Sequence, residues 1–398
     1  MLKLFSSLRA ATTRKSALPQ LSSPASTLVL TARLKDQAEP QQRYQKGGYH
    51  PVHPGEIYND RYRVIHKLGW GISSTIWLVQ DTRSQSMAAM KVLIGDLTAQ
   101  RANGGWDELG ALQNLKTKNT NSIGYHHVCQ LLDSFTCKGP NGDHICLILE
   151  PMKFSVFDIY FSLPGAMPLP LLKRISKHVL SALQYLHDDC GIVHTDIRGD
   201  NILISGDPVE EGQVEIKVKY DDLMSSIFKL SDFGAANMMA NRFARMIQPG
   251  ALRSPEVIIG APWDTKADIW NLGCLIYEFA RGTKLFDPHW ERETSGLSPT
   301  QTHLSQIIGL RGDFPSSLLK TGSRTNLYFD DQGVLLQGGN RYQITLHDLL
   351  SRGEYSAEET LQLEEFLSPM LTIDPTKRWT AAQLLEHPWL STVDQSAP

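Results

Sequence analysis

A ten-residue stretch, 192–201, constrains this chain more than any other part of its sequence. It reads Ile-Val-His-Thr-Asp-Ile-Arg-Gly-Asp-Asn and offers a carboxylate, Asp196, and an amide oxygen, Asn201, in a short loop. A second carboxylate follows at Asp232, in Leu-Ser-Asp-Phe-Gly. One carboxylate to orient a hydroxyl, with an amide and a second carboxylate to hold magnesium, is the set that phosphoryl transfer from ATP requires. Loops are rich in Asp and Asn in any case, so the spacing alone also fits a loop without chemistry.

A glycine turn between two strand-like runs precedes this loop. Residues 69–74 read Gly-Trp-Gly-Ile-Ser-Ser, with Ser74 where a third glycine is expected. Glycines there let backbone N–H groups approach phosphate oxygens, although hairpin glycines are also common. The next strand, 88–93, places Lys91 in the middle of an apolar run. A lysine there needs a partner or a ligand to offset its desolvation, so we expect Lys91 to bind the α- and β-phosphates.

The carboxylate partner of Lys91 is expected on the helix that follows. Apolar residues recur at inward helical spacing from residue 106 to residue 115. Glu108 is the predicted partner and Asp107 the competing choice, because the glycine pair at 104–105 obscures where the helix begins.

A further apolar strand, 144–150, ends at Pro151. A linker at that point would join a small β-rich part of the molecule to a larger helical part. The adenine would then lie against residues 150–152 and bond to backbone groups, with Leu149 at the back of the pocket. A plain core strand is compatible with the same residues.

Two helices and one ion pair are expected to be structural. Residues 172–187 have one apolar face, and residues 268–279 are apolar nearly all round, which predicts a buried helix. Asp268 begins the second helix, where a carboxylate suits the helix dipole and can accept bonds from backbone N–H groups of the Asp-Asn loop. Late in the chain, Arg378 is a natural bidentate partner for Glu256.

Residues 1–45 differ from the rest of the chain. They are rich in Ser and basic residues, have no acid before Asp36, and begin with an amphipathic stretch, 1–9. This composition is typical of a mitochondrial transit peptide and also of a disordered basic arm on a cytoplasmic or nuclear protein. Either interpretation places the segment outside the fold.

The bulk properties exclude other classes of protein. A net charge of −3 implies no general attraction to nucleic acid or to an anionic membrane. No apolar run reaches the roughly 18 residues that a transmembrane helix requires. The five cysteines form no Cys-x-x-Cys pair, which predicts free, mostly buried thiols in a reducing compartment. We expect a monomer that contacts neither nucleic acid nor membrane directly.

In their order, these motifs resemble the eukaryotic protein kinase domain over residues 60–391. The glycine turn, Ala-Met-Lys, a helical Glu, His-x-Asp with Asn, Asp-Phe-Gly, Ser-Pro-Glu, Asp-x-Trp-x-x-Gly and a late Arg occur in that family's sequence of motifs. The resemblance implies an α+β, bilobal protein kinase fold, with a small β-rich N-lobe at 60–150 and a larger helical C-lobe at 151–391. It also implies ATP and Mg²⁺ as cofactors and a protein hydroxyl as the acceptor.

Several motifs are similar in wording to the SR-protein kinase (SRPK-like) family, in its short, fungal-type form. They are Gly-Tyr-His-Pro-Val at 48–52, Lys-Leu-Gly-Trp-Gly at 67–71, His-Thr-Asp-Ile at 194–197 and Ser-Pro-Met-Leu at 368–371. Ser74 and Thr195 are also familiar at their positions in that family. The resemblance implies a serine kinase with high basal activity that acts on arginine/serine-rich, splicing-type proteins.

The resemblance gives each candidate site residue a role. The catalytic residues are Asp196 as the base, Lys91, Asn201, and Arg198 to neutralise the transferred phosphoryl group. Asn201 and Asp232 are the metal ligands. The nucleotide is expected to contact Leu68, Gly69, Gly71, Ser74, Ile76, Ala89, Lys91, Glu108, Leu149, Glu150 and Met152.

Some positions bear on regulation and substrate choice. Because position 195 is Thr, no Arg beside the base reaches for a phosphorylated activation loop, and we expect activity without loop phosphorylation. The family's long spacer after the catalytic Asn is reduced to a polar stretch, 205–228, expected to be a β-hairpin extension or a mobile insert. Thr302 and Gly309 replace acidic docking residues, which removes carboxylates that would pair with substrate arginines.

Three other functions compete with this interpretation. A tyrosine kinase can have an Arg at position 198, but residues 252–256 lack the tryptophan segment of that class. A pseudokinase scaffold would have lost catalytic residues that are all present here. A small-molecule kinase of the choline type is not expected to combine the Ser-Pro-Glu, Asp-x-Trp-x-x-Gly and late-Arg motifs.

Overall fold

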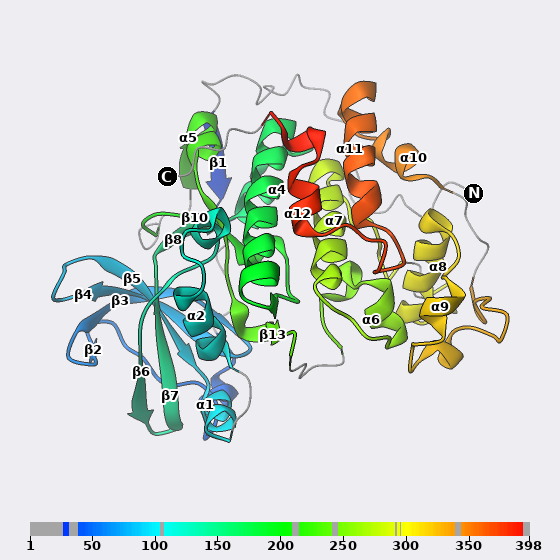
Figure 1. Ribbon diagram of the computed structural model, residues 1–398. Helices are drawn as coiled ribbons and strands as arrows, with labels where there is room; N and C mark the ends of the chain where they lie inside the picture. The colour runs from blue at the N-terminus through cyan, green and yellow to red at the C-terminus, as the bar shows by residue number, and fades with distance from the viewer. Residues whose placement is uncertain are drawn as a thin grey trace.

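The computed structural model describes residues 27–31, 39–103, 107–208, 215–240, 246–290, 293–294, 296–338 and 344–392. Figure 1 shows a β-sheet with α1 and α2 beside it at one end of the molecule and a larger group of helices at the other. The expected α+β, bilobal architecture is therefore confirmed, with the sheet in the N-lobe and most helices in the C-lobe.

The N-lobe is built on a six-stranded antiparallel sheet in the order β2-β3-β4-β5-β7-β6. Its strands are β2 (Ile57–Tyr58), β3 (Tyr62–Gly71), β4 (Ser74–Asp81), β5 (Met87–Leu93), β6 (Leu131–Gly139) and β7 (Gly142–Leu149). The two N-lobe helices are α1 (Gly95–Ala102) and α2 (Glu108–Thr117). Alternate residues of β5 and β7 enter different cores: Leu147 packs in the main core with the leucines of α2, whereas Val92 and Cys146 join a separate apolar cluster on the other face.

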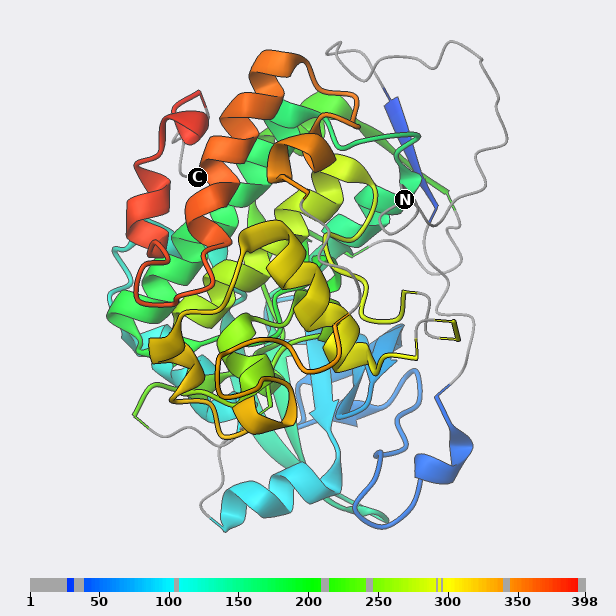
Figure 2. The same cartoon turned by 90° about the vertical axis from the view of Figure 1, so that its right-hand side faces the viewer.

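The C-lobe packs around two long helices, α4 (Leu169–Gln184) and α7 (Lys266–Arg281). The remaining C-lobe helices are α3 (Val156–Ser162), α5 (Tyr220–Ser225), α6 (Pro255–Ile259), α8 (Pro299–Arg311), α9 (Ser316–Leu319), α10 (Leu346–Leu350), α11 (Ala357–Met370) and α12 (Ala381–Leu385). Figure 2 shows α11 and α12, in orange and red, at the end of the molecule away from the sheet. The two C-lobe helices predicted from apolar periodicity are confirmed, although the first ends in a π-helical turn at Tyr185–Asp189.

Two small sheets fix the ends of the loop that carries Asp196 and Asn201. The loop leaves β9 (Ile192–Val193), which pairs with β13 (Asn237–Met238). It then enters β10 (Ile202–Ser205), which lies between β8 (Met152–Ser155) and β12 (Phe228–Leu230). Backbone pairing on both sides therefore holds the loop in one place, and β12 delivers Asp232 beside it.

The expectation that residues 1–45 lie wholly outside the fold is wrong for two segments: residues 39–45, where the buried Glu39 pairs with Lys67, and residues 27–31. Residues Thr27–Thr31 form β1, which pairs antiparallel with β11 (Glu215–Lys219). Leu28 and Leu30 alternate into the main core at 6% and 0% exposure, whereas Val29 points outward at 40%. The Thr-Leu-Val-Leu-Thr alternation is that of a half-buried strand, and it overrides the polar composition around it. Residues 1–26 and 32–38 lie outside the described part of the chain.

The polar stretch 205–228 also differs from its prediction. Its strand, β11, pairs with β1 from far away in the sequence, instead of forming a hairpin within the stretch. The helix α5 follows directly, with Leu223 buried in the core. Residues 209–214 are not described.

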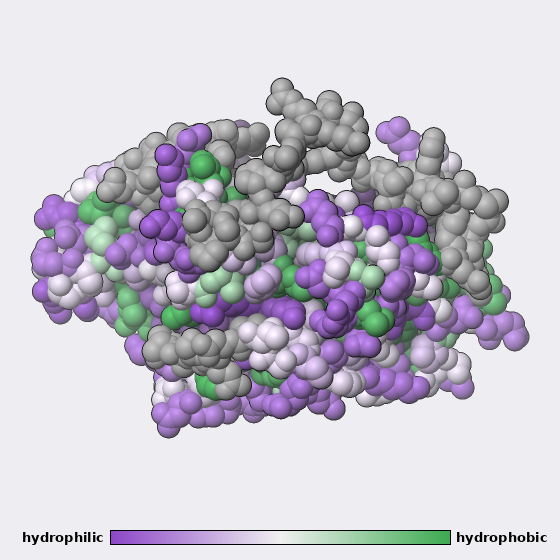
Figure 3. All heavy atoms as spheres, turned by 90° about the horizontal axis from the view of Figure 1, so that it is seen from above, coloured by the Kyte–Doolittle hydropathy of each residue, from purple (hydrophilic) through white to green (hydrophobic). Residues whose placement is uncertain are grey.

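Figure 3 shows hydrophobic residues scattered among hydrophilic ones on the face seen from above. Single exposed apolar residues of this kind are normal for a globular protein. Within the described ranges, no helix combines the length and the apolar composition needed to cross a membrane.

Candidate active site

Lys91 lies at the centre of the site, on β5, with only 4% of its surface exposed. Its Nζ donates to Glu108 Oε1 at 2.7 Å and to Asp232 Oδ1 at 2.8 Å. The predicted Lys91–Glu108 ion pair is thus present. Burial by itself would lower the pKa of the Lys91 ammonium, but the two carboxylates outweigh burial and raise it, so the lysine is charged.

The competing partner, Asp107, has a different role. It caps α2, accepting a hydrogen bond from the N–H of Gly110 at 2.6 Å, and it pairs with Arg101 at 2.5 Å. Glu108 is the first residue of the helix and faces the sheet. Trp106, which the sequence pattern placed on the same helix, lies outside the described residues.

Asp196 and Asn201 are in direct contact. Asn201 Nδ2 donates to the Asp196 carbonyl oxygen at 2.9 Å and to its carboxylate Oδ2 at 3.0 Å. Since the amide uses its nitrogen for Asp196, its oxygen is the atom that can face a cation. Burial raises the pKa of the Asp196 carboxyl, and the charges of His194 and Arg198 oppose that rise.

Asp232 completes the group from the opposite side. The Lys91 ammonium lowers the pKa of Asp232 to about 2, so this carboxylate is ionised at any physiological pH. Its side chain is 45% exposed and therefore has room for a ligand. In the described part of the chain, no three His, Cys, Asp or Glu side chains come together as a metal site. An amide oxygen and one carboxylate do suit Mg²⁺, which takes few protein ligands and completes its shell with water and phosphate oxygens.

The loop around Asp196 is held by α7, as predicted. Asp268 has no exposed surface and accepts hydrogen bonds from the N–H groups of His194 and Thr195, both at 2.8 Å. Two further anchors were not predicted: His187 Nε2 lies 2.9 Å from Asp268, and Asn271 donates to the Ile197 carbonyl at 2.7 Å. A signal for Asn271 exists in the sequence, because it lies one helical turn after Asp268 on a buried helix.

Thr195 joins this loop to the segment after Asp232. Its hydroxyl donates to the carbonyl of Ala235 at 2.7 Å. Its φ of 68° lies in the left-handed region, which is costly for a β-branched residue. The hydrogen bond from its N–H to Asp268 supports this conformation.

Arg198 does not point at Asp196. Its guanidinium forms an ion pair with Asp200, and 44% of its side chain is exposed. Its charge nevertheless lowers the pKa of Asp196, so it acts on the base electrostatically. The predicted role of Arg198 in neutralising a transferred phosphoryl group stays a prediction.

Four of the residues expected around the nucleotide share one face of the sheet. Ile76 pairs with Lys91, and Ala89 pairs with Leu149. Because Ala89 and Lys91 are two positions apart on β5, all four side chains are on the same side. The glycine turn connects β3 to β4, and Gly71 pairs with Ser74 across it. The Tyr49 hydroxyl donates to the Gly71 carbonyl at 2.8 Å.

At the junction of the lobes, the side chain of Glu150 is already engaged. Both carboxylate oxygens accept from Lys229 Nζ, at 2.7 and 2.8 Å, and one also accepts from the Gln130 N–H. The Glu150 N–H donates to the Gln130 carbonyl at 3.1 Å. Any contact of Glu150 with an adenine would therefore be made through its own carbonyl oxygen, in agreement with the expected backbone recognition.

The structural ion pair between Arg378 and Glu256 is confirmed. The two guanidinium nitrogens lie 2.8 and 3.0 Å from the two carboxylate oxygens, and neither side chain has exposed surface. This bidentate contact connects the end of the chain to α6. The segment 246–254 leads into α6.

That segment contains a clamp that sequence reasoning missed. Gln248 is buried and has a φ of 70°. Its side chain accepts from the N–H of Ser254 at 2.9 Å and donates to the Ala267 carbonyl at 2.7 Å. Arg253 adds hydrogen bonds to the carbonyls of Ile247 and Gln248, at 3.0 and 2.9 Å. No local pattern signals these contacts, because they depend on how the loop folds back on α7.

The two positions that replace acidic docking residues lie on α8. Thr302 is 5% exposed, and its hydroxyl oxygen is buried without a partner among the described residues. Gly309 is half-buried and has no side chain. Neither position presents a charge to a basic substrate.

Comparisons with known proteins agree with this geometry. The family model described as "Protein kinase domain" matches residues 62–390. A serine/threonine-protein kinase SRPK from Physarum polycephalum is 33% identical, over 88% of this chain and 90% of its own length. Protein kinase dsk1 from Schizosaccharomyces pombe is 28% identical, over 92% and 87%. SRSF protein kinase 3 from Mus musculus is 24% identical, over 90% and 91%.

Proposed function

Since this chain belongs to the protein kinase family as an SRPK-like serine/threonine kinase, we propose that it phosphorylates serines in arginine/serine-rich proteins and that it is active without activation-loop phosphorylation. The observation that carries the proposal is the arrangement around Lys91. One lysine joins Glu108 on α2 to Asp232 from the far lobe, beside the Asp196–Asn201 pair. An active kinase requires the lysine–glutamate ion pair together with an Asp-Phe-Gly aspartate placed to hold Mg²⁺.

In the proposed mechanism, Lys91 holds the α- and β-phosphates of ATP while Glu108 keeps its ammonium in place. Asp232 and the amide oxygen of Asn201 are the residues that would hold Mg²⁺, which when bound neutralises charge on the phosphate oxygens. Asp196 orients the substrate hydroxyl and accepts its proton. Asn201 assists by fixing the Asp196 carboxylate through the 3.0 Å hydrogen bond.

Three contacts support activity without loop phosphorylation. Thr195 occupies the place of a phosphate-reading arginine and uses its hydroxyl to hold Ala235, after the Asp-Phe-Gly motif. Gln248 holds the segment before Ser254 through its neutral amide side chain, and the charged guanidinium of Arg253 donates to the Gln248 carbonyl. None of these contacts needs a phosphoryl group.

Phosphatase treatment tests the independence from phosphorylation. The purified chain is dephosphorylated, its loop is checked by mass spectrometry, and its initial rate is compared with that of the untreated protein. We expect equal rates. A dephosphorylated protein that is inert until an upstream kinase is added would refute this part of the proposal.

A panel of acceptors tests the substrate class. Radiolabelled ATP is supplied with an arginine/serine repeat peptide, a generic basic protein and choline. We expect transfer to serine in the repeat peptide with the highest kcat/KM. Because positions 302 and 309 carry no carboxylates, we expect this preference to be weaker than docking through an acidic surface would produce. Equal use of all basic proteins would retain the kinase and refute the arginine/serine preference.

For the N-terminal segment we propose a basic arm on a cytoplasmic or nuclear protein. β1 restricts the alternative, because removal of a leader that extended past Thr27 would delete a strand that pairs with β11. Imaging fusions of residues 1–26 and 1–45 to a fluorescent protein tests it. Mitochondrial import of either fusion would refute the proposal.

A further inference from the structure

A group of sulfur and imidazole side chains lies on the N-lobe sheet, away from the candidate active site. In the β6–β7 hairpin, Cys137 is opposite His144 and Phe135 is opposite Cys146. The two cysteines are therefore diagonal neighbours on one face, and their Sγ atoms are 3.5 Å apart. Cys146 is fully buried, whereas Cys137 is partly exposed at the edge strand of the sheet.

A buried base lies next to the thiol pair. His50 packs over Gly139, where a Cβ would meet His50 Nδ1 at 2.2 Å, and its ring centroid is 4.9 Å from that of His144. His50 Nε2 is 3.1 Å from the Tyr58 hydroxyl, which itself donates to Glu56, so Nε2 carries the ring proton. His50 Nδ1 then keeps its lone pair, in a buried position without a hydrogen-bond partner among the described residues.

The two thiols are electrostatically unequal. The Cys146 S–H points at Cys137 Sγ and lowers the pKa of the Cys137 thiol, and burial opposes this effect. The same contact raises the pKa of Cys146. The partly exposed sulfur is therefore the nucleophile, and the buried sulfur remains a thiol.

We propose that Cys137 and Cys146 form a reversible peroxide-reactive disulfide site in the N-lobe. Cys137 gives its proton to His50 Nδ1, and its thiolate attacks hydrogen peroxide, forming an S–O bond as the O–O bond breaks and hydroxide leaves. The product is a sulfenic acid. The sulfur of Cys146 then attacks the sulfenic sulfur, and the S–O bond breaks to leave a disulfide. The two thiol protons end in two molecules of water, so two thiols are oxidised and one peroxide is reduced.

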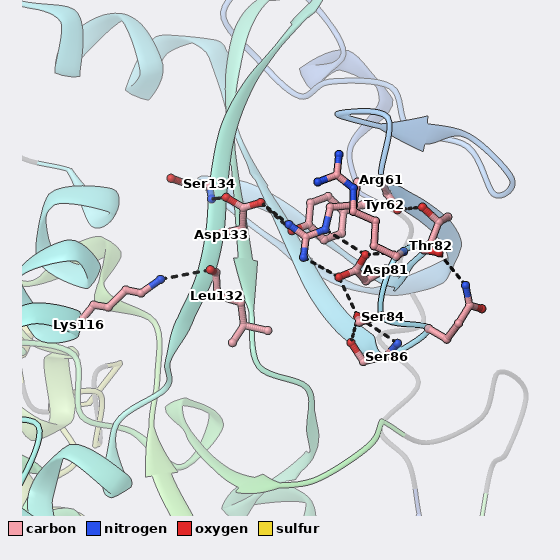
Figure 4. A network of polar contacts seen from close by, with 12 residues as sticks. Arg61, Tyr62, Asp81, Thr82, Ser84, Ser86, Lys116, Leu132, Asp133 and Ser134 are labelled. Atoms are coloured by element: carbon pink, nitrogen blue, oxygen red, sulfur yellow. Dashed lines mark hydrogen bonds and ion pairs between the residues drawn. The ribbon is translucent and has the colours of Figure 1, made fainter.

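The hairpin keeps the two sulfurs in reach of one another. Figure 4 shows Asp133 of β6 facing Tyr62, the first residue of β3, and Arg61, the residue before it. The Tyr62 hydroxyl donates to Asp133 at 2.7 Å. The Tyr62 ring stacks on Phe135, at 5.9 Å between centroids, next to the cysteines. β6 is thus fixed although it is an edge strand. Its hairpin turn and this anchor lie on either side of Cys137.

The proposed cross-link lies on the face of the sheet opposite to Lys91. Lys91 pairs with Leu147, whereas the neighbouring Val92 pairs with Cys146. Side chains alternate along a strand, so Cys146 and Lys91 point to opposite sides. We therefore expect the oxidised protein to keep its kinase activity, and the proposal is tested by covalent state and not by rate.

The experiment treats the folded, full-length protein with a small excess of hydrogen peroxide, alkylates the remaining thiols and maps the cysteines by mass spectrometry. We expect loss of two of the five thiols, one peptide linking Cys137 to Cys146, and recovery of both thiols with dithiothreitol. Cys137→Ala is expected to lose no thiols, because Cys146 is buried and has no exposed partner once Cys137 is removed. Cys190→Ala, at a buried cysteine elsewhere, is the matched control and should form the linkage as the unaltered chain does.

His50→Gln separates chemistry from packing. The titratable groups that face Cys137 are His50 and Tyr58 from the segment before β3, and His144 and Cys146 from β7. We expect thiol loss in His50→Gln to slow by roughly threefold to tenfold at pH 7 and to match the unaltered chain at pH 9, where the thiol ionises without help.

Three results would overturn the proposal. They are loss of all five thiols at one rate, oxidation of Cys137 to a sulfinic acid with Cys146 still free, and stoichiometric zinc in the purified protein that blocks both thiols. The last result is not expected, because no metal-binding group of three or more ligands occurs in the described ranges.

Discussion

At the scale of single residues, the site separates two carboxylates by their surroundings. Asp232 lies against the Lys91 ammonium, which lowers its pKa, while burial raises the pKa of Asp196. A low pKa suits a ligand that must stay ionised beside a cation, and a raised pKa suits a group that accepts a proton. The same residue type therefore suits the two proposed roles, and the difference comes from neighbours distant in the sequence.

The exchange Asp196→Asn tests the base. The side chain keeps its size and can still contact Asn201, but it cannot accept the substrate proton. We expect kcat to fall by roughly two to four orders of magnitude while the KM for ATP changes little. Asp200→Asn, four residues along the same loop, is the control and should alter kcat far less. An unchanged kcat in Asp196→Asn would contradict the assignment.

The pH dependence of the reaction follows from the same carboxyl. As the proposed base, Asp196 must be deprotonated to act, and its pKa in the folded protein is raised above the ordinary value of 3.8. As the pH falls, activity is therefore lost at a higher pH than an exposed aspartate would give. The measurement is kcat/KM against pH with the folded fraction followed by circular dichroism. An acid limb at or below 3.8 in protein that remains folded would count against a raised pKa.

At the scale of elements, two short segments N-terminal to the kinase domain pack against it: the segment before β2 and the strand β1. The segment before β2 reaches the glycine turn through Tyr49, which is 1% exposed and bonds to Gly71. β1 covers the core beside α3 and pairs with the strand β11. The first contact limits how far the glycine turn can move, and the second attaches residues 215–219 to the N-terminal strand.

The exchange Tyr49→Phe tests the first of these contacts. It removes only the hydroxyl that holds the Gly71 carbonyl, so the glycine turn becomes more mobile while the ring stays packed. One such hydrogen bond contributes about 0.5–1.5 kcal/mol, and we expect the KM for ATP to rise by roughly 2- to 10-fold with kcat nearly unchanged.

The matched control for that exchange is Tyr355→Phe. Tyr355 also donates to a backbone carbonyl, that of Met167 at 2.5 Å, but in the C-lobe. Steady-state kinetics at varied ATP concentration compare the two variants. If both change the KM for ATP equally, the effect is one of general stability and the positioning role of Tyr49 is wrong.

The exchange Leu30→Ala tests whether β1 belongs to the folded domain. Leu30 is fully buried, and truncation of a buried leucine costs about 2–5 kcal/mol of unfolding free energy. Val29→Ala, in the same strand but 40% exposed, should cost well under 1 kcal/mol. Urea unfolding followed by fluorescence gives both values. Equal, small effects would mean that the segment contributes little to the fold.

At the scale of the whole molecule, a single buried ion pair connects the end of the chain to the region that precedes α7. Arg378 and Glu256 come from positions far apart in the sequence and have no exposed side-chain surface. A buried pair of this kind adds little net stability compared with an apolar pair, but the loss of one partner leaves a buried charge.

The exchange Glu256→Ala measures that cost. We expect the unfolding free energy to fall by about 3–5 kcal/mol, because the Arg378 guanidinium would remain buried without its carboxylate. Lys377→Ala, at the neighbouring residue whose side chain is 75% exposed, is the control and should change it by less than about 0.5 kcal/mol. Thermal and urea unfolding provide the measurement. A Glu256→Ala protein as stable as the control would contradict the predicted cost.

Much of the fold and of the site could be predicted from local sequence. The apolar face of α4, the buried α7 and the strands around Lys91 all follow from periodicity, which depends only on nearby residues. The choice of Glu108 over Asp107 needed the structure, because the two adjacent carboxylates differ only in where the helix begins. The orientation of Arg198 also needed the structure, because its guanidinium binds Asp200 at the loop surface.

The sequence by itself determined the fold class, the order of the motifs and the identity of the groups proposed to carry out phosphoryl transfer. Only the tertiary structure decided that residues 27–31 join the fold, that Gln248 clamps the segment before α6, and that Cys137 lies against Cys146 beside His50. The physical reason is distance along the chain. Propensity and periodicity act over a few residues, whereas these contacts form between segments that meet only when the cores of the two lobes have closed.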